Sequence, residues 1–377
     1  MPVSISGTNG VTFPDSSLQA AAASPYVLKN RIINGAMMID QRNAGASYAQ
    51  INNQYNLDRW KGFSYAGSAV TGKYTVQQNA GAVTSPVGFV NYLGVTSSAT
   101  TADAATNIFG VAQSIEGLNM ADFGWGTANA VTVTVSFWVR SSLTGTFGGA
   151  IQNSGGNRSY PFTYTISSAN TWEQKSVTIA GDTSGTWLTT NGLGLQIIFS
   201  FGVGSTYSAS AGSWAAGNYY SVTGATSVVG TSGATFYLTG VQLEIGTSAT
   251  PFERRLYNQE LANCYRYYYR YKATGAGDFF GVGQCFSSTQ ALIATQFPAV
   301  MRSSPSALEQ SGTASDYRTT NSTSTLVSCS SVPTFNSCSA IQATTIVTVA
   351  SGLTAGNSTL TAANTGTNGY LGWSAEL

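Results

Sequence analysis

The stretch Val131-Thr132-Val133-Thr134-Val135-Ser136-Phe137-Trp138-Val139 alternates apolar with polar residues. Successive side chains of a β-strand point to opposite faces of its sheet, so this alternation predicts a strand with one buried face. The same spacing recurs in 162–166, 175–179, 193–201 and 236–245, where Gly240 interrupts it as a bulge glycine does. Turn-forming residues and no helical periods separate these segments. Residues 29–250 are therefore predicted to form an antiparallel jelly-roll β-sandwich.

The composition indicates a folded chain with an uncharged polar surface. Charged residues make up 8% of the 377 residues, against about 25% in a typical soluble domain. The 20 Tyr, 17 Phe and 7 Trp exclude a disordered chain. A surface of Ser, Thr, Asn, Gln and Gly suits contacts between subunits, because few ions have to be desolvated. The net charge of +1 gives no field that would attract nucleic acid or anionic lipid, so neither partner is expected.

The N-terminus does not read as an export signal. Met1-Pro2-Val3-Ser4 lacks the charged and apolar regions of a signal peptide. No apolar run approaches the roughly 18 residues that cross a bilayer. Synthesis in a cytoplasm without membrane insertion is therefore expected, which fits a virion component released by lysis and equally an ordinary cytosolic protein.

Residues 1–28 are predicted to be an appendage to the sandwich. The segments 4–8 and 10–15 alternate apolar and polar residues between turn formers, the pattern of short β-hairpins. They are too short to bury a core, so Ile5, Val11 and Phe13 are expected to dock on another chain. A mobile tail is the alternative interpretation.

Residues 251–274 are predicted to form a short connector helix, with Thr250 as its N-cap and Pro251 as its first residue. This segment holds the densest charge of the chain. Two interpretations stay open: the charges are solvated or paired within the chain, or the helix packs against other copies and its charges fix their register. Residues 275–377 return to short strands and are predicted to form a second, smaller β domain.

Several segments resemble, in a consistent order, a family of bacteriophage tail-fibre or receptor-binding proteins that carry a carbohydrate-binding-module-like jelly roll. They are Asn30-Arg31-Ile32-Ile33-Asn34-Gly35, Asp40-Gln41-Arg42, Asp58-Arg59-Trp60, Gln113-Ser114-Ile115-Glu116, Ser136-Phe137-Trp138-Val139-Arg140, 240–246, 249–253, 260–268, 297–302 and Ser374-Ala375-Glu376-Leu377. Residues 5–19 are similar to segments of marine and cyanobacterial phage fibres. The resemblance implies a homotrimeric virion appendage that docks to other phage tail or virion proteins. It does not imply a known ligand, although the name of the fold suggests a glycan on the host surface.

Catalysis is not expected. The chain has no histidine, which excludes imidazole acid–base and Ser-His-Asp chemistry. Glycoside hydrolysis needs two carboxyl groups about 5–10 Å apart, whereas the 15 Asp and Glu are scattered. Glu253 and Glu260 lie among arginines, and Asp58 beside Arg59 is expected to hold a loop. No catalytic residue is therefore assigned.

Cofactors and metals are not expected either. The four cysteines form no C-x-x-C pair, which argues against zinc. Cys329 and Cys338 could meet across a hairpin, but reduced thiols are favoured over a disulfide after cytoplasmic folding. Calcium held by backbone carbonyls stays open, because sequence does not show such ligands.

Sugar binding is the function that the loop aromatics suggest, because aromatic rings pack on the C–H faces of pyranoses. The candidates lie in Gly/Ser-rich segments and are Trp187, Tyr207, Trp214, Tyr219 and Tyr220. The alternative is that they are core or interface aromatics, as Trp138 and Trp172 are expected to be. Residues 316–318 and 334–336 of the distal domain are a second possible place. The leading hypothesis is a fibre subunit that contacts the host; the alternatives are a purely architectural adaptor or decoration fibre, and a polysaccharide depolymerase.

Overall fold

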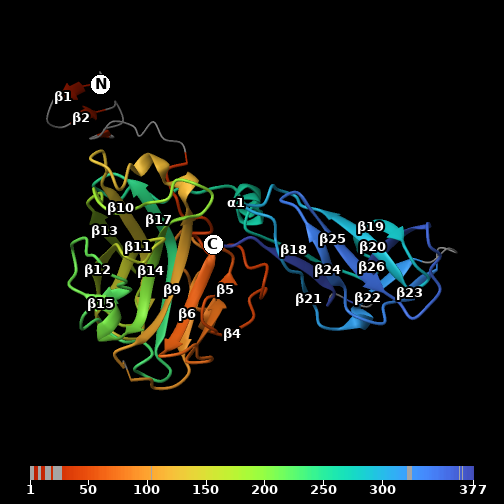
Figure 1. Ribbon diagram of the computed structural model, residues 1–377. Coiled ribbons are helices and arrows are strands. Elements are labelled where there is room, and N and C mark those ends of the chain that lie inside the picture. The colour runs from red at the N-terminus through yellow and green to blue at the C-terminus, as the bar shows by residue number, and fades with distance from the viewer. Residues whose placement is uncertain are drawn as a thin grey trace.

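The computed structural model describes residues 28–377 except 103, 321–324, 365 and 367, together with the backbone of three short strands that precede them (Figure 1). These strands form one antiparallel sheet in the order β1 (Ser4–Ser6), β2 (Gly10–Thr12) and β3 (Leu18–Gln19). The side chains of Ile5, Val11 and Phe13 fall outside the described residues, so their predicted docking role stays a prediction.

Two six-stranded antiparallel sheets pack face to face and confirm the predicted sandwich. The first sheet has the order β13 (Glu173–Ile179), β10 (Val133–Ser141), β17 (Thr235–Ile245), β8 (Leu93–Ser97), β7 (Tyr74–Gln78) and β4 (Tyr48–Ala49). The second has the order β12 (Ser159–Ile166), β11 (Gly145–Asn153), β14 (Leu193–Val203), β9 (Asn107–Glu116), β6 (Trp60–Ala66) and β5 (Gln54–Leu57). A parallel pair, β15 (Ser208–Ala209) and β16 (Ser221–Val222), forms a separate small sheet, whose β16 packs on β11, β12 and β14 of the second sheet.

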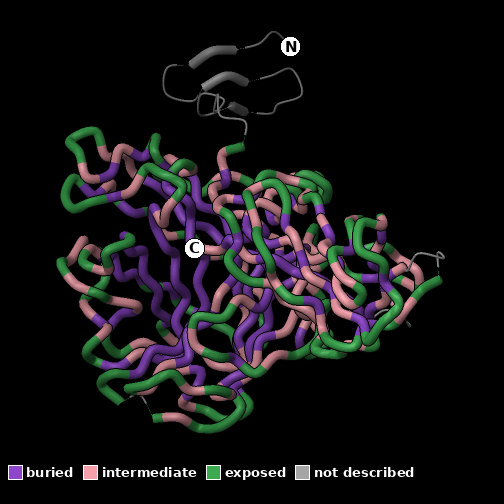
Figure 2. Tube along the Cα trace, turned by 45° about the vertical axis from the view of Figure 1, so that its right-hand side comes forward, coloured by how far each residue is buried: buried purple, intermediate pink, exposed green. Residues whose placement is uncertain are grey.

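The core of the sandwich lies between the two sheets, and the buried stretches of Figure 2 concentrate in its strands. Aromatic rings meet there edge to face; Phe137 of β10 and Phe199 of β14, for example, have ring centroids 4.9 Å apart. The predicted bulge is present: the register between β10 and β17 shifts opposite Phe137, and Gly240 has a φ of 60°. A side chain at that position would meet the Phe89 ring at 2.6 Å, so glycine is required there.

The connector helix is shorter than predicted. Helix α1 spans Tyr257–Tyr265 with Leu256 at its N-cap, so the expectation that Thr250 caps it and Pro251 starts it is wrong. The hydroxyl of Thr250 donates instead to the Glu244 carboxylate, at 2.6 Å. Beyond the helix, Tyr268–Lys272 forms strand β18, because a run of tyrosines favours extended over helical backbone. The second β domain therefore begins before residue 275.

The C-terminal domain consists of two antiparallel sheets. The larger has the order β23 (Leu326–Ser328), β22 (Tyr317–Thr320), β26 (Ser358–Ala363), β19 (Phe279–Cys285), β20 (Gln290–Gln296), β25 (Gln342–Thr348) and β24 (Thr334–Cys338). The smaller has the order β18, β27 (Tyr370–Ser374) and β21 (Glu309–Gln310). Short 3-10 turns complete the chain at Ala80–Ala82, Gly117–Asn119, Ala121–Phe123, Ser205–Tyr207 and Ala314–Asp316.

The four cysteines are free thiols, as favoured from the sequence. Burial raises the pKa of Cys329 to about 12 and that of Cys338 to about 11, which keeps both protonated at neutral pH. Within the part of the chain that the structure describes, no helix is long and apolar enough to span a bilayer.

Candidate functional site in a groove between the two domains

The predicted loop tryptophans pack on the sandwich core. Trp187 and Trp214 cluster with Trp125, at centroid distances of 4.8 and 5.2 Å from it. Trp187 is 7% exposed, and its indole N–H donates to the Ser184 carbonyl at 3.1 Å and to Asp182. This burial matches the alternative interpretation, a core aromatic, because the faces of the Trp187 ring are covered by protein.

The predicted tyrosines lie on the outer face of the second sheet. Tyr220 packs edge to face on Phe63 of β6, with centroids 5.3 Å apart, and Tyr207 packs on Tyr220. The backbone of Tyr219 accepts a hydrogen bond from Gln152 at 2.6 Å. The loop that carries these residues thus covers the outer face of the sheet, which is why β9 and β14 are buried on both sides. The structure does not bring the five predicted aromatics together around one concavity.

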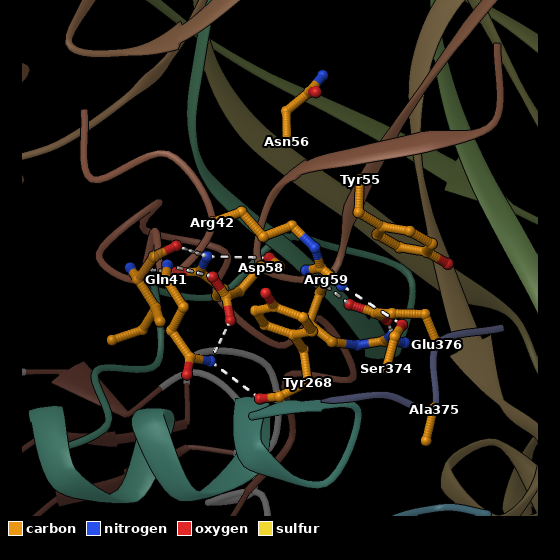
Figure 3. Close-up of polar contacts among 12 residues, drawn as sticks. Gln41, Arg42, Tyr55, Asn56, Asp58, Arg59, Tyr268, Ser374, Ala375 and Glu376 are labelled. Atoms are coloured by element: carbon orange, nitrogen blue, oxygen red, sulfur yellow. Dashed lines mark hydrogen bonds and ion pairs between the residues drawn. The ribbon is translucent and has the colours of Figure 1, made fainter. Parts of the chain in front are cut away.

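A buried ion-pair network joins the sandwich to the C-terminal domain (Figure 3). Arg59 pairs with Glu376 across 317 residues of sequence, and their side chains are 1% and 4% exposed. The Arg59 guanidinium also stacks 3.5 Å from the centroid of the Tyr267 ring. Burial is the largest single effect and lowers the pKa of Arg59, but Glu376, Tyr267, Tyr55 and Cys264 together outweigh burial and hold this pKa above its ordinary value. The Arg59 guanidinium therefore stays charged, and its pair with Glu376 links one domain to the other.

Asp58 holds the adjoining loop, as expected from the sequence. It accepts hydrogen bonds from the backbone and the side chain of Gln41, at 2.8 and 2.5 Å, and the Gln41 amide also donates to the Tyr268 carbonyl at 3.0 Å. Burial raises the pKa of Asp58 to about 6, although Arg42 and the Gln41 hydrogen bonds oppose the rise. Asp58 therefore has a positioning role and is not presented to solvent.

A second ion pair attaches the connector to the sandwich. Arg266 pairs with Glu116 of β9 through two contacts of 2.9 and 2.6 Å, and the Tyr267 hydroxyl donates to the same carboxylate at 2.6 Å. Burial raises the pKa of Glu116, but these partners outweigh it and lower the pKa overall. Arg255 likewise pairs with Glu260 at 3.1 Å. These connector charges are paired within the chain, as the first of the two interpretations holds.

Lys61 of β6 provides a pH-dependence test of this buried region. Burial, and next the charge of Arg59, lowers the pKa of Lys61 from 10.5 to about 8. Between these values the unfolded chain binds a proton that the folded chain does not, so stability from this group rises with pH. We expect the wild type to gain about 2–3 kcal/mol over Lys61→Met between pH 8 and 10.5. Urea unfolding of both proteins across this range measures the gain, and parallel profiles would contradict it.

Next to the ion-pair network, a groove of about 880 Å³ opens between the two domains. The sandwich contributes β4, β5 and the turn between them, and the C-terminal domain contributes β18, β21 and β27. The lining residues are aromatic, amide and charged; they are Arg42, Asn43, Tyr48, Asn52, Asn53, Gln54, Tyr55, Arg270, Leu308, Glu309, Gln310, Tyr370 and Ser374.

The two arginines that line the groove stack on tyrosine rings and lie close to carboxylates. The Arg42 guanidinium stacks 3.5 Å from the centroid of the Tyr268 ring, and Arg270 stacks 3.9 Å from that of Tyr370. The Tyr268 hydroxyl donates to Glu309 at 2.6 Å, while Arg270 lies 3.4 Å from the same carboxylate. Arg42 lies 3.4 Å from Glu376. Each arginine thus lies near a carboxylate, and Glu376 is shared between Arg42 and Arg59.

The walls of the groove carry polar groups that are available to a ligand. Asn53, in the turn before β5, and Gln54, the first residue of β5, are exposed, and Tyr370 is half-buried on the opposite wall. Among the hydrogen bonds of the described residues, none uses the Tyr370 hydroxyl, the Asn53 side chain or the Nε2 of Gln310. The groove can therefore donate and accept several hydrogen bonds beside tyrosine rings.

Sequence reasoning missed this groove. Its walls come from positions 48–55, 270, 309–310 and 370, which no local pattern connects. The one local signal is the amide-rich run Asn52-Asn53-Gln54, which interrupts the apolar alternation as an exposed turn does.

Comparison with known proteins found similar chains among the solved structures only. No family model and no curated protein matches. A putative sugar-binding protein from Bacteroides thetaiotaomicron VPI-5482 is 11% identical with a TM-score of 0.34, over 58% of this chain and 100% of that one. The enzymatically active domain of tailspike protein 4 from bacteriophage CBA120 is 11% identical with a TM-score of 0.29. The likeness covers 58% of this chain and 21% of the tailspike chain.

A family 11 carbohydrate-binding module from Clostridium thermocellum, in complex with a mixed-linked tetrasaccharide, is 14% identical with a TM-score of 0.27. The likeness covers 54% of this chain and 98% of that module. These TM-scores are below 0.5, so the likenesses carry no argument about function. The function is therefore inferred from the chain's own residues.

Proposed function

We propose that this chain is a non-enzymatic subunit of a bacteriophage tail fibre, which attaches to the particle through residues 1–28 and binds a neutral glycan of the host surface. The observation that carries the glycan part is the groove between the domains. It combines tyrosine rings with unpaired amides and a hydroxyl, the mixture of apolar surface and convergent polar groups typical of small-molecule sites.

The two arginines of the groove favour an uncharged ligand. Arg42 and Arg270 each stack on a tyrosine ring and lie 3.4 Å from a carboxylate, so these contacts compete with a phosphate or an acidic sugar for both guanidinium groups. Hydroxyl groups, in contrast, match Asn53, Gln54 and the Tyr370 hydroxyl as donors and acceptors. A neutral oligosaccharide is the ligand that these groups satisfy best.

The carboxylates support a binding role over hydrolysis. Glu309 is the carboxylate among the residues that line the groove, whereas glycoside hydrolysis needs two. Glu376 is buried against Arg59, and Asp58 is buried against Gln41. Neither presents a free carboxyl group to a bound sugar.

The virion part of the proposal rests on the sequence. The ordered resemblance to phage fibres, the uncharged polar composition and the short appended strands β1–β3 all fit a particle-borne, homotrimeric fibre. The alternative of a purely architectural fibre predicts that the isolated protein, at saturating concentration, fails to block adsorption of the phage to its host.

Binding to an array of immobilised neutral oligosaccharides tests the glycan site. The full chain is expected to retain at least one glycan class. Tyr370→Ala and Gln54→Ala are each expected to weaken that binding about tenfold, because each removes one hydrogen bond or ring contact worth about 1–2 kcal/mol.

Tyr257→Ala is the matched control, because Tyr257 is 52% exposed on α1 and outside the groove. It is expected to bind like the wild type. Absence of binding to every glycan of the array, or equal binding by all four proteins, would remove the groove as the site.

A further inference from the structure

The side-chain amide of Gln41 connects the two domains at the free edge of strand β18 (Figure 3). Its Nε2 donates to the Tyr268 carbonyl at 3.0 Å, and its Oε1 accepts from the Arg270 backbone N–H at 3.2 Å. In a β-strand, backbone groups two residues apart point to the same edge, where a neighbouring strand would pair with them. The other edge of β18 pairs with β27. One side chain of the sandwich therefore extends the hydrogen bonding of a sheet in the C-terminal domain.

The two arginines of the groove depend on this contact for their positions. Arg42 follows Gln41 in the chain, and its backbone carbonyl accepts a hydrogen bond from the Arg270 guanidinium at 2.5 Å. The backbone N–H of Arg270 is the group that Gln41 Oε1 holds. Both arginines line the groove, one from each domain. The orientation of the Gln41 amide thus influences how the two walls of the groove meet.

Asp58 determines which way round the Gln41 amide lies. Its Oδ2 accepts from the Gln41 backbone N–H at 2.8 Å, and its Oδ1 accepts from Gln41 Nε2 at 2.5 Å. An ionised carboxylate offers acceptors alone, whereas a protonated one also carries an O–H donor. A proton on Oδ1 would face Nε2–H, unless the amide turned over and offered Oε1. A turned amide would place N–H against the Arg270 N–H and oxygen against the Tyr268 carbonyl, so both bonds to β18 would be lost.

The charged and titratable groups around Asp58 come from the Gln41 loop, the turn between β5 and β6, helix α1, β18 and the C-terminal segment. They are Arg42, Arg59, Cys264, Tyr265, Tyr268 and Glu376. Burial raises the pKa of the thiol and of both phenols, so these three groups stay neutral between pH 5 and 7.5. Glu376 pairs with Arg59, and Glu260 of α1 pairs with Arg255. Asp58, in contrast, has no ion pair among the described residues, so its charge depends most directly on pH.

The hydrogen bonds from Gln41 and the charge of Asp58 are linked. Burial raises the pKa of Asp58 from 3.8 to about 6, while the Gln41 hydrogen bonds act to lower it. Because these bonds favour the ionised form, ionisation strengthens them by the same free energy. Between pH 4 and 6 the folded chain binds a proton that the unfolded chain does not, so this group stabilises the fold as the pH falls. The contact can therefore loosen in mild acid without unfolding of either domain.

We propose that the Gln41 amide is a proton-controlled latch between the two domains, which is closed while Asp58 is ionised and opens when Asp58 is protonated. The closed latch holds β18, and with it Arg270, in the arrangement that forms the groove. Mild acid therefore weakens glycan binding. This consequence rests on the proposed function, whereas the latch itself needs no ligand.

The backbone amide of Arg270 allows the latch to be measured in the full chain without glycan. In protein labelled with 15N-arginine, the NMR signal of this amide is expected to move between pH 7.5 and 5.0 with a midpoint near 6, because Asp58 passes from about 97% to about 9% ionised. Arg270→Lys assigns the signal. Asp58→Asn, an uncharged isostere of the protonated carboxyl group, is expected to abolish the movement. Its signal at pH 7.5 should lie where that of the wild type lies at pH 5.0.

Asp40→Asn is the matched control, because Asp40 is a neighbouring carboxylate that accepts from the backbone of Asn43 and Gly45 and not from Gln41. It should leave the movement of the Arg270 signal unchanged. A signal that stays still in the wild type, or that moves equally in Asp58→Asn, would overturn the latch. Loss of the movement in Asp40→Asn alone would do the same, because it would place the proton on Asp40.

Glycan retention on the same array at both pH values tests the consequence for the groove. The wild type is expected to bind about tenfold more weakly at pH 5.0, because two hydrogen bonds to β18 are lost. Asp58→Asn should bind equally weakly at both pH values. Equal retention by the wild type at both pH values would overturn regulation of the groove. A moving Arg270 signal without retention of any glycan would support the latch and remove the glycan function.

Discussion

Replacing Arg59 by methionine is expected to lower the free energy of unfolding by about 3 kcal/mol. Methionine keeps much of the volume of the arginine stem, but it leaves the Glu376 carboxylate buried without its main partner. Removing one member of a buried pair typically costs about 3–5 kcal/mol. The lower end of this range is expected because Arg42 remains 3.4 Å from the same carboxylate.

Urea unfolding at pH 7 measures this loss. Lys175→Met is the matched control, because Lys175 and its partner Glu173 lie near the surface at 21% and 16% exposure. Surface pairs contribute about 0–1 kcal/mol, so the control should change little. If Arg59→Met loses less than the control does, the buried pair does not hold the two domains together.

Replacing Trp187 by alanine is expected to cost about 3–5 kcal/mol, the range for truncating a buried aromatic residue to alanine. The Trp187 ring lies against Trp125 and Trp214, with centroid distances of 4.8 and 5.3 Å. Truncation removes these contacts and leaves a cavity that the flanking strands cannot fill. Thermal or urea unfolding measures the effect.

Tyr207→Ala provides the comparison, because Tyr207 is half-buried on the outside of the sheet and should cost less than about 1.5 kcal/mol. This pair separates the two interpretations of the loop aromatics. A Trp187→Ala protein of normal stability that fails to attach to cells would reverse the structural interpretation and restore Trp187 as a ligand-binding residue.

The sandwich could be predicted because most of its strands alternate. The segment 131–139 indicated β10, and Gly240 indicated the bulge in β17. Strand β9 (Asn107–Glu116) gave no such pattern, because it is buried on both faces and polar residues are not needed on either. The extent of the connector helix was also mispredicted. The prediction rested on the helical spacing of a few apolar residues and left out the preference of the tyrosines at 267–271 for extended backbone.

The candidate site could not be predicted, since it does not exist within any one segment. Its two walls belong to different domains, and Arg59 and Glu376 are what place those walls beside each other. Loop position alone suggested Trp187 as a ligand residue, but loop position does not reveal which side of a sheet a ring packs on. Burial and the pairing of charges carry that information, and both arise only after folding.

The distance along the chain between Arg59 and Glu376 has a consequence for biosynthesis. A ribosome adds about 5–20 residues per second, so roughly 15–60 s pass between translation of the arginine and translation of its carboxylate partner, which lies 317 positions later. During this interval the nascent sandwich carries an unpartnered cation at what becomes its docking surface. Early strands β7 and β8 must likewise wait for β17 to emerge before their sheet can close. The two domains can thus dock only after residue 376 has been added, whereas every strand of the sandwich is available once β17 has emerged.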